Sequence, residues 1–141
     1  ITADEALTLV ASLVGLEAVA PALDPAITRA ARPATERLNA HLLQRAVRRQ
    51  DLAWLASPVT GGAVPVAPTL QALLAARAAA PTQPAAWPTV VWDTLQQHGH
   101  ELAKDGRPVT DAASALAMLQ ALVPQMQDKA VPALRRLQVI E

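Results

Sequence analysis

The sequence predicts an all-α chain that folds as a compact bundle of about five to seven helices, several of them broken or started by proline. Hydrophobic residues make up 52% of the chain, and many of them are Ala or Leu, both strong helix formers. With three Trp, no Phe and no Tyr, alternating β-branched and aromatic runs are missing, so strands have little to form from. Pro and Gly lie between the periodic segments and mark the turns.

The longest helical pattern without an internal Gly or Pro is predicted for residues 33–56. Pro33 suits the first helical position, because its missing N–H would have no partner there. Ser57-Pro58, followed by Gly61-Gly62, marks the predicted end. The apolar half of this helix comprises Leu38, Leu42, Leu43, Ala46, Val47, Ala53 and Trp54. The polar half comprises Arg37, His41, Gln44, Arg45, Arg48 and Asp51.

Two shorter helices are predicted before it. Thr2 and Glu5 have the spacing of a capping box, and the helix that they start is predicted to continue to about Ala20. It is apolar around most of its circumference, which is typical of a central, buried helix. Asp24-Pro25 then starts a short helix, which should end at Arg32-Pro33 because the residue before proline is pushed out of helical geometry.

The middle of the chain is nearly free of charge, with Arg77 alone between Leu52 and Trp92. Residues 57–67 and 81–84 are predicted loops, and residues 68–80 a helix. Exposed loops normally carry charge, so this composition indicates that something covers them. One interpretation is a loop folded over its own core. The other, which we favour, is a surface that contacts a partner through Val64, Val66 and Trp87.

The remaining helices follow in short succession. Residues 88–98 form a predicted helix that ends at Gly99, and residues 104–108 a turn. Thr110 is predicted to cap the next helix, with Asp111 complementing its dipole and Pro124 kinking it. Its apolar stripe comprises Ala112, Leu116, Leu119, Leu122, Val123 and Met126. Val131-Pro132 starts a last short helix.

The composition limits the classes of protein to which the chain can belong. A chain of 141 residues fits one domain, residues 1–141, and 12 basic against 12 acidic residues give no net field toward nucleic acid or membrane. Without Cys there are no disulfides and no thiolate chemistry. The longest uncharged run, residues 52–76, contains five Pro or Gly and is not a spanning helix. The compartment stays open, with the cytoplasm favoured.

No catalytic or cofactor motif is present. The serines lack a nucleophile-elbow context, and no phosphate-binding glycine loop occurs. His98, His100 and Glu101 are three metal-ligand types within four residues, but a site needs further convergent ligands, and His41 lies on another helix. We therefore expect no enzyme, no cofactor and no metal, with His98 as a helix-end histidine.

A basic helix face is the sharpest feature of the charge pattern. Between residues 29 and 49 there are six Arg and one acid, Glu36. The candidate basic face is Arg37, His41, Arg45 and Arg48. It is either a solvated face that pairs with acids such as Asp4, Glu5 or Asp93, or a surface that binds nucleic acid or phosphate.

The segment Ala40-His41-Leu42-Leu43-Gln44-Arg45 resembles the phosphorylated-histidine helix of histidine-containing phosphotransfer domains, which are four-helix bundles of similar size. The resemblance covers six residues and implies phosphorylation of His41. Those domains have Lys near the position of Gln44 and Gly near that of Arg45. An Arg there would obstruct the docking kinase.

Together these features predict a non-enzymatic helical protein-protein interaction or structural module, a subunit or domain of a larger assembly. Its partner would be another protein or a second copy. A nucleic-acid or phosphate-binding helical domain that uses the Arg-rich face is the first alternative, and a phosphotransfer bundle is the second.

Overall fold

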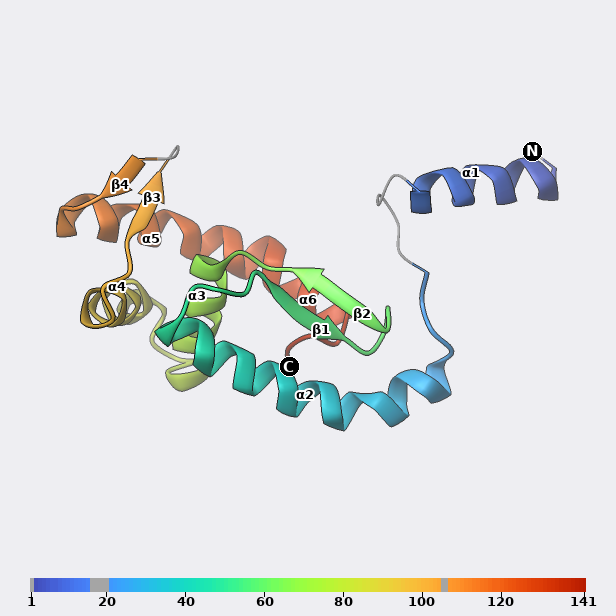
Figure 1. Cartoon of the computed structure of the whole chain (residues 1–141), viewed down its shortest axis with the longest axis horizontal. Helices are drawn as coiled ribbons and strands as arrows, with labels where there is room; N and C mark the ends of the chain where they lie inside the picture. Colours follow the sequence, from blue (N-terminus) through green and yellow to red (C-terminus); the bar gives the residue numbers. More distant parts are fainter. Residues whose placement is uncertain (1, 16–20, 105–106) are drawn as a thin grey trace.

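The computed structural model describes residues 2–15, 21–104 and 107–141, and the chain is mainly helical with two small antiparallel sheets (Figure 1). The helices are α1 (Ala3–Gly15), α2 (Pro25–Arg48), α3 (Pro68–Ala79), η1 (Pro84–Ala86), α4 (Trp87–Gln97), α5 (Ala112–Gln125), η2 (Met126–Ala130) and α6 (Val131–Arg136). The strands are β1 (Trp54–Ser57), β2 (Gly62–Pro65), β3 (Leu102–Lys104) and β4 (Arg107–Val109). The all-α prediction is thus wrong at two hairpins. Of the described helices, none has both the length and the apolar character needed to cross a bilayer.

α2 is one continuous helix rather than a short helix followed by a long one. Asp24 caps it as predicted, with its Oδ1 accepting from the Ala26 N–H at 2.7 Å. Pro33 lies inside the helix, contrary to the expected break at Arg32-Pro33. The surrounding turn is largely exposed, so water can reach the carbonyl that loses its N–H partner. The Thr35 hydroxyl also donates to the Ala31 carbonyl at 3.1 Å across this turn.

The β1–β2 hairpin replaces the predicted end of that helix and the predicted loop at 57–67. Leu55 pairs with Val64, and Trp54 pairs with Pro65 on the outer side, where Trp54 is 51% exposed. The buried side chain of Asn39 in α2 fixes β1, because its amide donates to the Ala56 carbonyl and accepts from the Ala56 N–H, both at 2.8 Å. The prediction of helix through Ala56 is therefore wrong after Arg48.

The turn of this hairpin also receives the chain that leads into α2. Leu23 donates its backbone N–H to the Val59 carbonyl at 2.7 Å. Its side chain lies over Gly61, where a Cβ would approach Leu23 Cδ1 to 2.7 Å. Gly61 has a φ of +69°, so the position favours glycine on both grounds.

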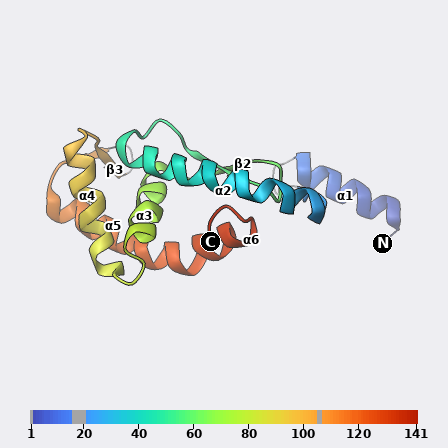
Figure 2. The same cartoon turned by 90° about the horizontal axis from the view of Figure 1, so that it is seen from below.

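The core lies between α3, α4, α5 and the β1–β2 hairpin (Figure 2). Leu73 of α3, Leu95 of α4 and Leu119 of α5 are fully buried, as their positions on the predicted apolar stripes require. Trp87 is buried with them, and its indole Nε1 donates to the Ala80 carbonyl at 2.7 Å. A buried Trp with a satisfied N–H is an anchor for this core.

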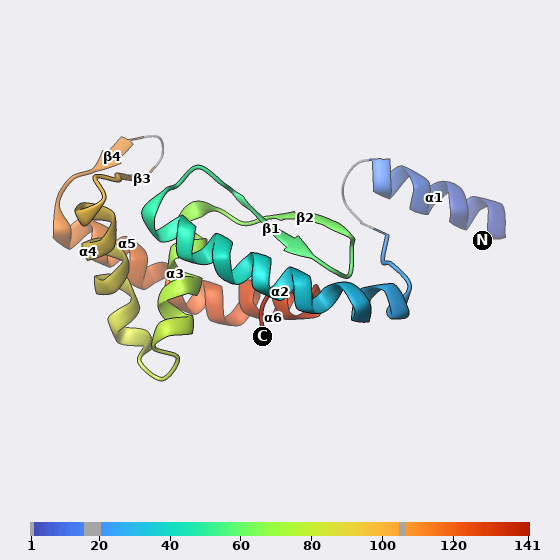
Figure 3. The ribbon, with the colours of Figure 1, turned by 60° about the horizontal axis from the view of Figure 1, so that its bottom comes forward.

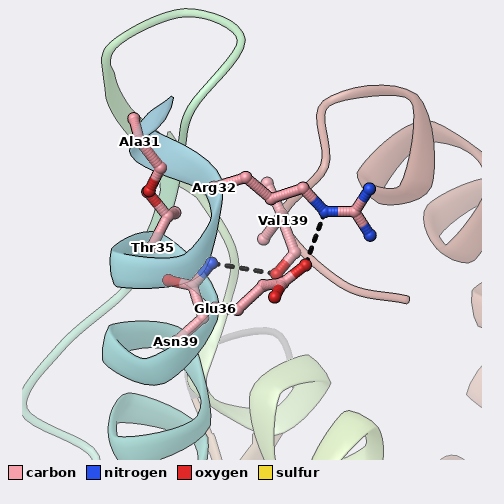
Figure 4. Close-up of polar contacts among 6 residues, drawn as sticks. All are labelled: Ala31, Arg32, Thr35, Glu36, Asn39 and Val139. Atoms are coloured by element: carbon pink, nitrogen blue, oxygen red, sulfur yellow. Dashed lines mark hydrogen bonds and ion pairs between the residues drawn. The ribbon is translucent and has the colours of Figure 1, made fainter. Parts of the chain in front are cut away.

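Two polar side chains fasten the C-terminal residues to the rest of the fold, and Figure 4 shows one of them, Asn39. Asn39 donates to the Val139 carbonyl at 2.9 Å, and the Ser57 hydroxyl donates to the Leu137 carbonyl at 2.7 Å. Beside them, Arg32 and Glu36 form an ion pair on the exposed side of α2. The single Asn of the chain thus links α2, β1 and the segment after α6.

The ends of α4 and α5 follow the local signals more closely than the end of α2 does. Gly99 ends α4 as predicted, in the left-handed conformation (φ +68°), with His100 N–H donating to the Leu95 carbonyl at 2.9 Å. α5 is capped by Asp111 and not by Thr110, because the Asp111 Oδ1 accepts from the Ser114 N–H at 2.7 Å. That hydrogen bond lowers the pKa of Asp111. The middle of the predicted turn at 104–108 lies outside the described residues.

α1 has the predicted capping box but not the predicted position. Thr2 N–H donates to Glu5 Oε2 at 2.8 Å, and Glu5 N–H donates to Thr2 Oγ1 at 3.2 Å. Leu7 is nevertheless 68% exposed, and Leu9 and Val10 are more than half exposed. α1 stands apart from the other elements in Figures 1 and 3, so the prediction of a central helix is wrong. Its predicted extension to Ala20 lies outside the described residues.

Candidate binding groove

The second half of α2, α3 and α4 enclose a groove of about 610 Å³, which we call the basic groove. Its floor and walls are apolar and consist of Val47, Ala72, Ala75, Ala76, Ala79, Val90, Val91 and Leu95. Its rim is basic and consists of His41, Arg45, Arg48, Arg49 and His98. Gln44 and Thr94 complete the lining.

The floor exists because α3 presents small residues on the side that faces the groove. Ala72, Ala75, Ala76 and Ala79 recur at helical spacing and leave room where larger side chains would fill it. Leu73 and Leu74 lie between them in sequence and point to the buried side. Since methyl groups fill less space than the isobutyl groups on the other face, α3 separates a packed core from an open channel.

The rim carries positive charge that its surroundings only partly neutralise. Arg45 forms an ion pair with Asp51, just past the end of α2, and this hydrogen-bonded guanidinium lowers the pKa of the Asp51 carboxyl. Among the residues that the structure describes, Arg48 and Arg49 have no acid within ion-pair distance. The groove lining described here also contains no carboxylate. The mouth of the groove therefore favours an anionic group.

His100 fixes the end of α2 where this rim lies. Its Nε2 is 2.6 Å from the Arg48 carbonyl. A carbonyl oxygen only accepts, so Nε2 carries the hydrogen and satisfies one of the last carbonyls of the helix. This contact joins the segment after α4 to α2 and holds Arg48 and Arg49 beside α4.

The same contact separates the two histidines of the candidate metal motif. His98 lines the basic groove, whereas His100 turns to α2, and their ring centroids are 6.4 Å apart at 41°. Within residues 2–15, 21–104 and 107–141, no three His, Asp or Glu side chains converge as a metal site would require.

The predicted basic face is divided between two surfaces. His41, Arg45 and Arg48 line the basic groove, whereas Arg37 lines a second, larger groove of about 900 Å³ on the other side of α3. That second groove has a mixed rim, with Arg77 and Arg135 offset by Glu36 and Glu141. The acids proposed as partners of the basic face, Asp4, Glu5 and Asp93, form no ion pair with it in the part of the chain that the structure describes.

Arg49 and His98 were not expected at the site. Arg49 lies at the edge of the apolar half of the wheel, and a basic residue at such an edge borders the packed face of a helix. The position of Arg49 on the helical wheel is thus the sequence signal that could have placed it at the groove. Nothing local in the sequence indicates that His98 of α4 lies across from α2, because that contact joins residues about 50 positions apart.

The predicted contact surface of Val64, Val66 and Trp87 requires correction. Trp87 is 1% exposed and Val66 2% exposed, both within the chain's own core, and Val64 is half-buried. The chain's own core covers parts of this segment, as in the competing interpretation, whereas residues 61–63 and 81–85 are exposed. A contact through Trp87 and Val66 is therefore wrong, and Val64 alone of the three is partly exposed.

An apolar channel with a positive mouth can hold a ligand that has an apolar face bordered by negative charge. No protein-family model, curated protein or solved structure matches this chain.

Proposed function

We propose that this chain is a non-enzymatic protein-interaction module that binds an apolar helix with acidic residues in the basic groove. The observation that supports this most is the combination of an alanine floor with Arg48 and Arg49 at the mouth, neither of which forms an ion pair among the described residues. Helices dock in grooves by laying an apolar stripe on the floor while the flanking residues meet the rim. Arg guanidinium groups pair well with carboxylates in that arrangement.

The shape of the floor favours a helix over a compact small ligand. Ala72 and Ala79 are seven residues apart, so the alanine stripe runs for about 10 Å, or two helical turns. Small residues at helical spacing let another backbone approach closely. A partner helix of two or three turns, with Leu or Val on one face, fits such a floor.

The rim also supports the alternative of a nucleic-acid or phosphate ligand, because the same guanidinium groups bind phosphate. Two features favour the protein partner. The walls between the arginines are Val, Ala and Leu, and the described lining contains no Trp, Tyr or Phe on which a base could stack. Arg45 is already paired with Asp51, and Arg37 faces the second groove, so the phosphate-binding row is incomplete.

Fluorescence anisotropy of the full chain with labelled peptides tests the proposal. The probes are a helical peptide with an apolar stripe flanked by Glu, the same peptide with Lys in place of Glu, a single-stranded DNA and an RNA. We expect binding of the Glu peptide alone. Arg48→Glu/Arg49→Glu should weaken it at least about tenfold, because like charges then meet across the groove.

Arg107→Glu/Arg136→Glu is the matched control, since it makes the same charge change at exposed arginines outside the basic groove. It should bind the Glu peptide as the unmodified chain does. Equal binding by the rim variant, or no binding of any peptide, would contradict the proposal. Steeply salt-dependent binding of DNA or RNA that the rim variant loses would establish the nucleic-acid alternative instead.

A further inference from the structure

α1 is an amphipathic helix whose apolar face has no cover among the described residues. Ala3, Ala6, Leu7 and Val10 lie on one side of the helical wheel, and Asp4 borders this stripe next to Leu7. Leu7 and Val10 are more than half exposed. Leu and Val side chains on a helix are usually buried in the folded protein. An exposed stripe of them therefore indicates an interaction site.

The charges of the N-terminal region are opposite to those of the basic groove. Residues 1–28 contain four acids (Asp4, Glu5, Glu17 and Asp24) and no Lys or Arg. The rim of the groove contains three Arg and two His with no acid in the described lining. One region therefore offers a small-residue and Leu stripe with acidic neighbours, and the other offers an alanine floor with basic neighbours.

From this complementarity we infer that α1 of a second copy of the chain occupies the basic groove, an inference that rests on the proposed function. Ala3, Ala6, Leu7 and Val10 would lie over the alanine floor of α3, with Asp4 toward Arg48 and Arg49. The arrangement covers the exposed apolar stripe and compensates the rim charge in one contact. It does not involve the capping box, which already uses Glu5 and Thr2.

A second copy suits the geometry better than the chain's own α1. Leu23 is fastened to the hairpin turn beside the start of α2, at the end of that helix opposite to Arg48 and Arg49. α1 lies at the end of the molecule away from α4, and so away from the groove of its own chain (Figures 1 and 2). A second copy can bring its α1 to the groove without changing this arrangement.

Reciprocal exchange of α1 closes the assembly as a symmetric dimer, in which both grooves are filled and both stripes are covered. Analytical ultracentrifugation of the full chain across a concentration series measures this directly. We expect a monomer–dimer equilibrium that added salt shifts toward monomer, because the contact pairs exposed charges. Asp4→Lys and Arg48→Glu/Arg49→Glu should each weaken dimerisation at least about tenfold.

Combining Asp4→Lys with Arg48→Glu/Arg49→Glu should restore most of the dimer, since the introduced lysine then faces the introduced glutamates. Thr8→Lys/Ser12→Lys, on the polar side of α1, makes the same charge change as Asp4→Lys and should leave the dimer intact. Circular dichroism checks that each variant keeps its helix content.

A monomer at every concentration would overturn the inference, as would a dimer that none of these charge changes affects. The proposed function is judged separately. A monomeric chain that still binds the Glu peptide through Arg48 and Arg49 retains that function and loses only the inferred partner.

Discussion

α1 and α5 are similar helices in sequence and opposite in surroundings. They have 13 and 14 residues, both consist largely of Ala, Leu and Val, and both begin with a side chain that accepts from a backbone N–H of the first turn. Yet Leu119 of α5 is fully buried, and Leu7 of α1 is 68% exposed. The difference shows that composition and capping determine whether a segment is helical. They do not determine which other segment buries its apolar side.

For α5 the partner that buries it is the same chain, because α4 lies against it and the buried side chains of both helices belong to one core. For α1 we propose a second copy. The same apolar periodicity thus yields a core helix in one place and a binding helix in the other, and the distinguishing signal is charge. α1 belongs to an acidic stretch, while the described lining of the basic groove holds only neutral and basic residues.

The largest expected effect separates the two helices by stability. Leu119→Ala should lower the free energy of unfolding by about 2–5 kcal/mol, because it leaves a cavity in the core. Leu7→Ala should change it by less than about 0.5 kcal/mol in dilute protein, since Leu7 is already in water. Urea melts of both variants at low concentration give the comparison. Equal losses would show that α1 packs on its own chain.

The second-largest effect on stability is expected at Asn39, a buried polar residue of α2. Asn39→Ala removes three hydrogen bonds and leaves part-buried backbone groups of Ala56 and the buried carbonyl of Val139 without that partner. We expect a loss of about 2–3 kcal/mol in the free energy of unfolding. Hydrogen exchange should also rise in residues 137–141 before it rises in α3. Unchanged protection there would mean that the C-terminal segment is held by apolar packing alone.

Local signals were sufficient for several helix ends. The capping box at Thr2, the Asp24-Pro25 start and the Gly99 end each depend on residues within one turn, and the structure confirms all three. Leu119 was predicted in the core from periodicity and is buried there. These features need no knowledge of the rest of the fold.

A smaller effect concerns the end of α6, which has the backbone pattern of Gly99 without glycine. Gln138 has a φ of +52°, and Val139 N–H donates to the Leu134 carbonyl at 2.9 Å. Gln138→Gly relieves the left-handed strain, partly offset by the greater freedom of glycine in the unfolded chain, so stability should rise by about 0.5–1 kcal/mol. Thermal melts measure it. A loss of stability would show that the Gln side chain makes a contact of its own.

The smallest effect is expected at the rim. Arg45→Gln/Arg48→Gln should leave the fold intact in dilute protein, because both side chains are exposed. Circular dichroism at neutral pH should match that of the unmodified chain, and the melting temperature should be only slightly lower, because the variant loses the exposed Arg45–Asp51 ion pair. An unfolded double variant would mean that these arginines are structural and that the basic groove is no free surface.

The ion pair of Arg45 with Asp51 makes a pH-dependent contribution to the stability of the fold. Arg45 lowers the pKa of Asp51 from its ordinary value of 3.8, so the ion pair stabilises the fold above that value. This contribution is lost as the pH falls through the lowered pKa. Melting curves of the double variant and the unmodified chain should therefore converge in acid. A difference that persists at low pH would have another cause.

The hairpins and the groove were out of reach of local patterns, because contacts between distant residues create them. Trp54 fits the apolar half of a helical wheel, but β1 is drawn into an extended form by Asn39 and by Val64 on β2. Arg48 and His98 belong to one rim only because α4 lies against α2. The buried position of Trp87 likewise depends on the Ala80 carbonyl and on the common core to which it belongs.

The measurement that tests the account most directly is hydrogen–deuterium exchange of the full chain at low and high protein concentration. The account predicts that amides of α1 exchange rapidly in dilute protein and become protected on concentration, while exchange in residues 41–49 and 90–98 slows in parallel. Arg48→Glu/Arg49→Glu should abolish both changes. Protection of α1 that is equal at every concentration, or that develops without any change around the basic groove, would contradict it.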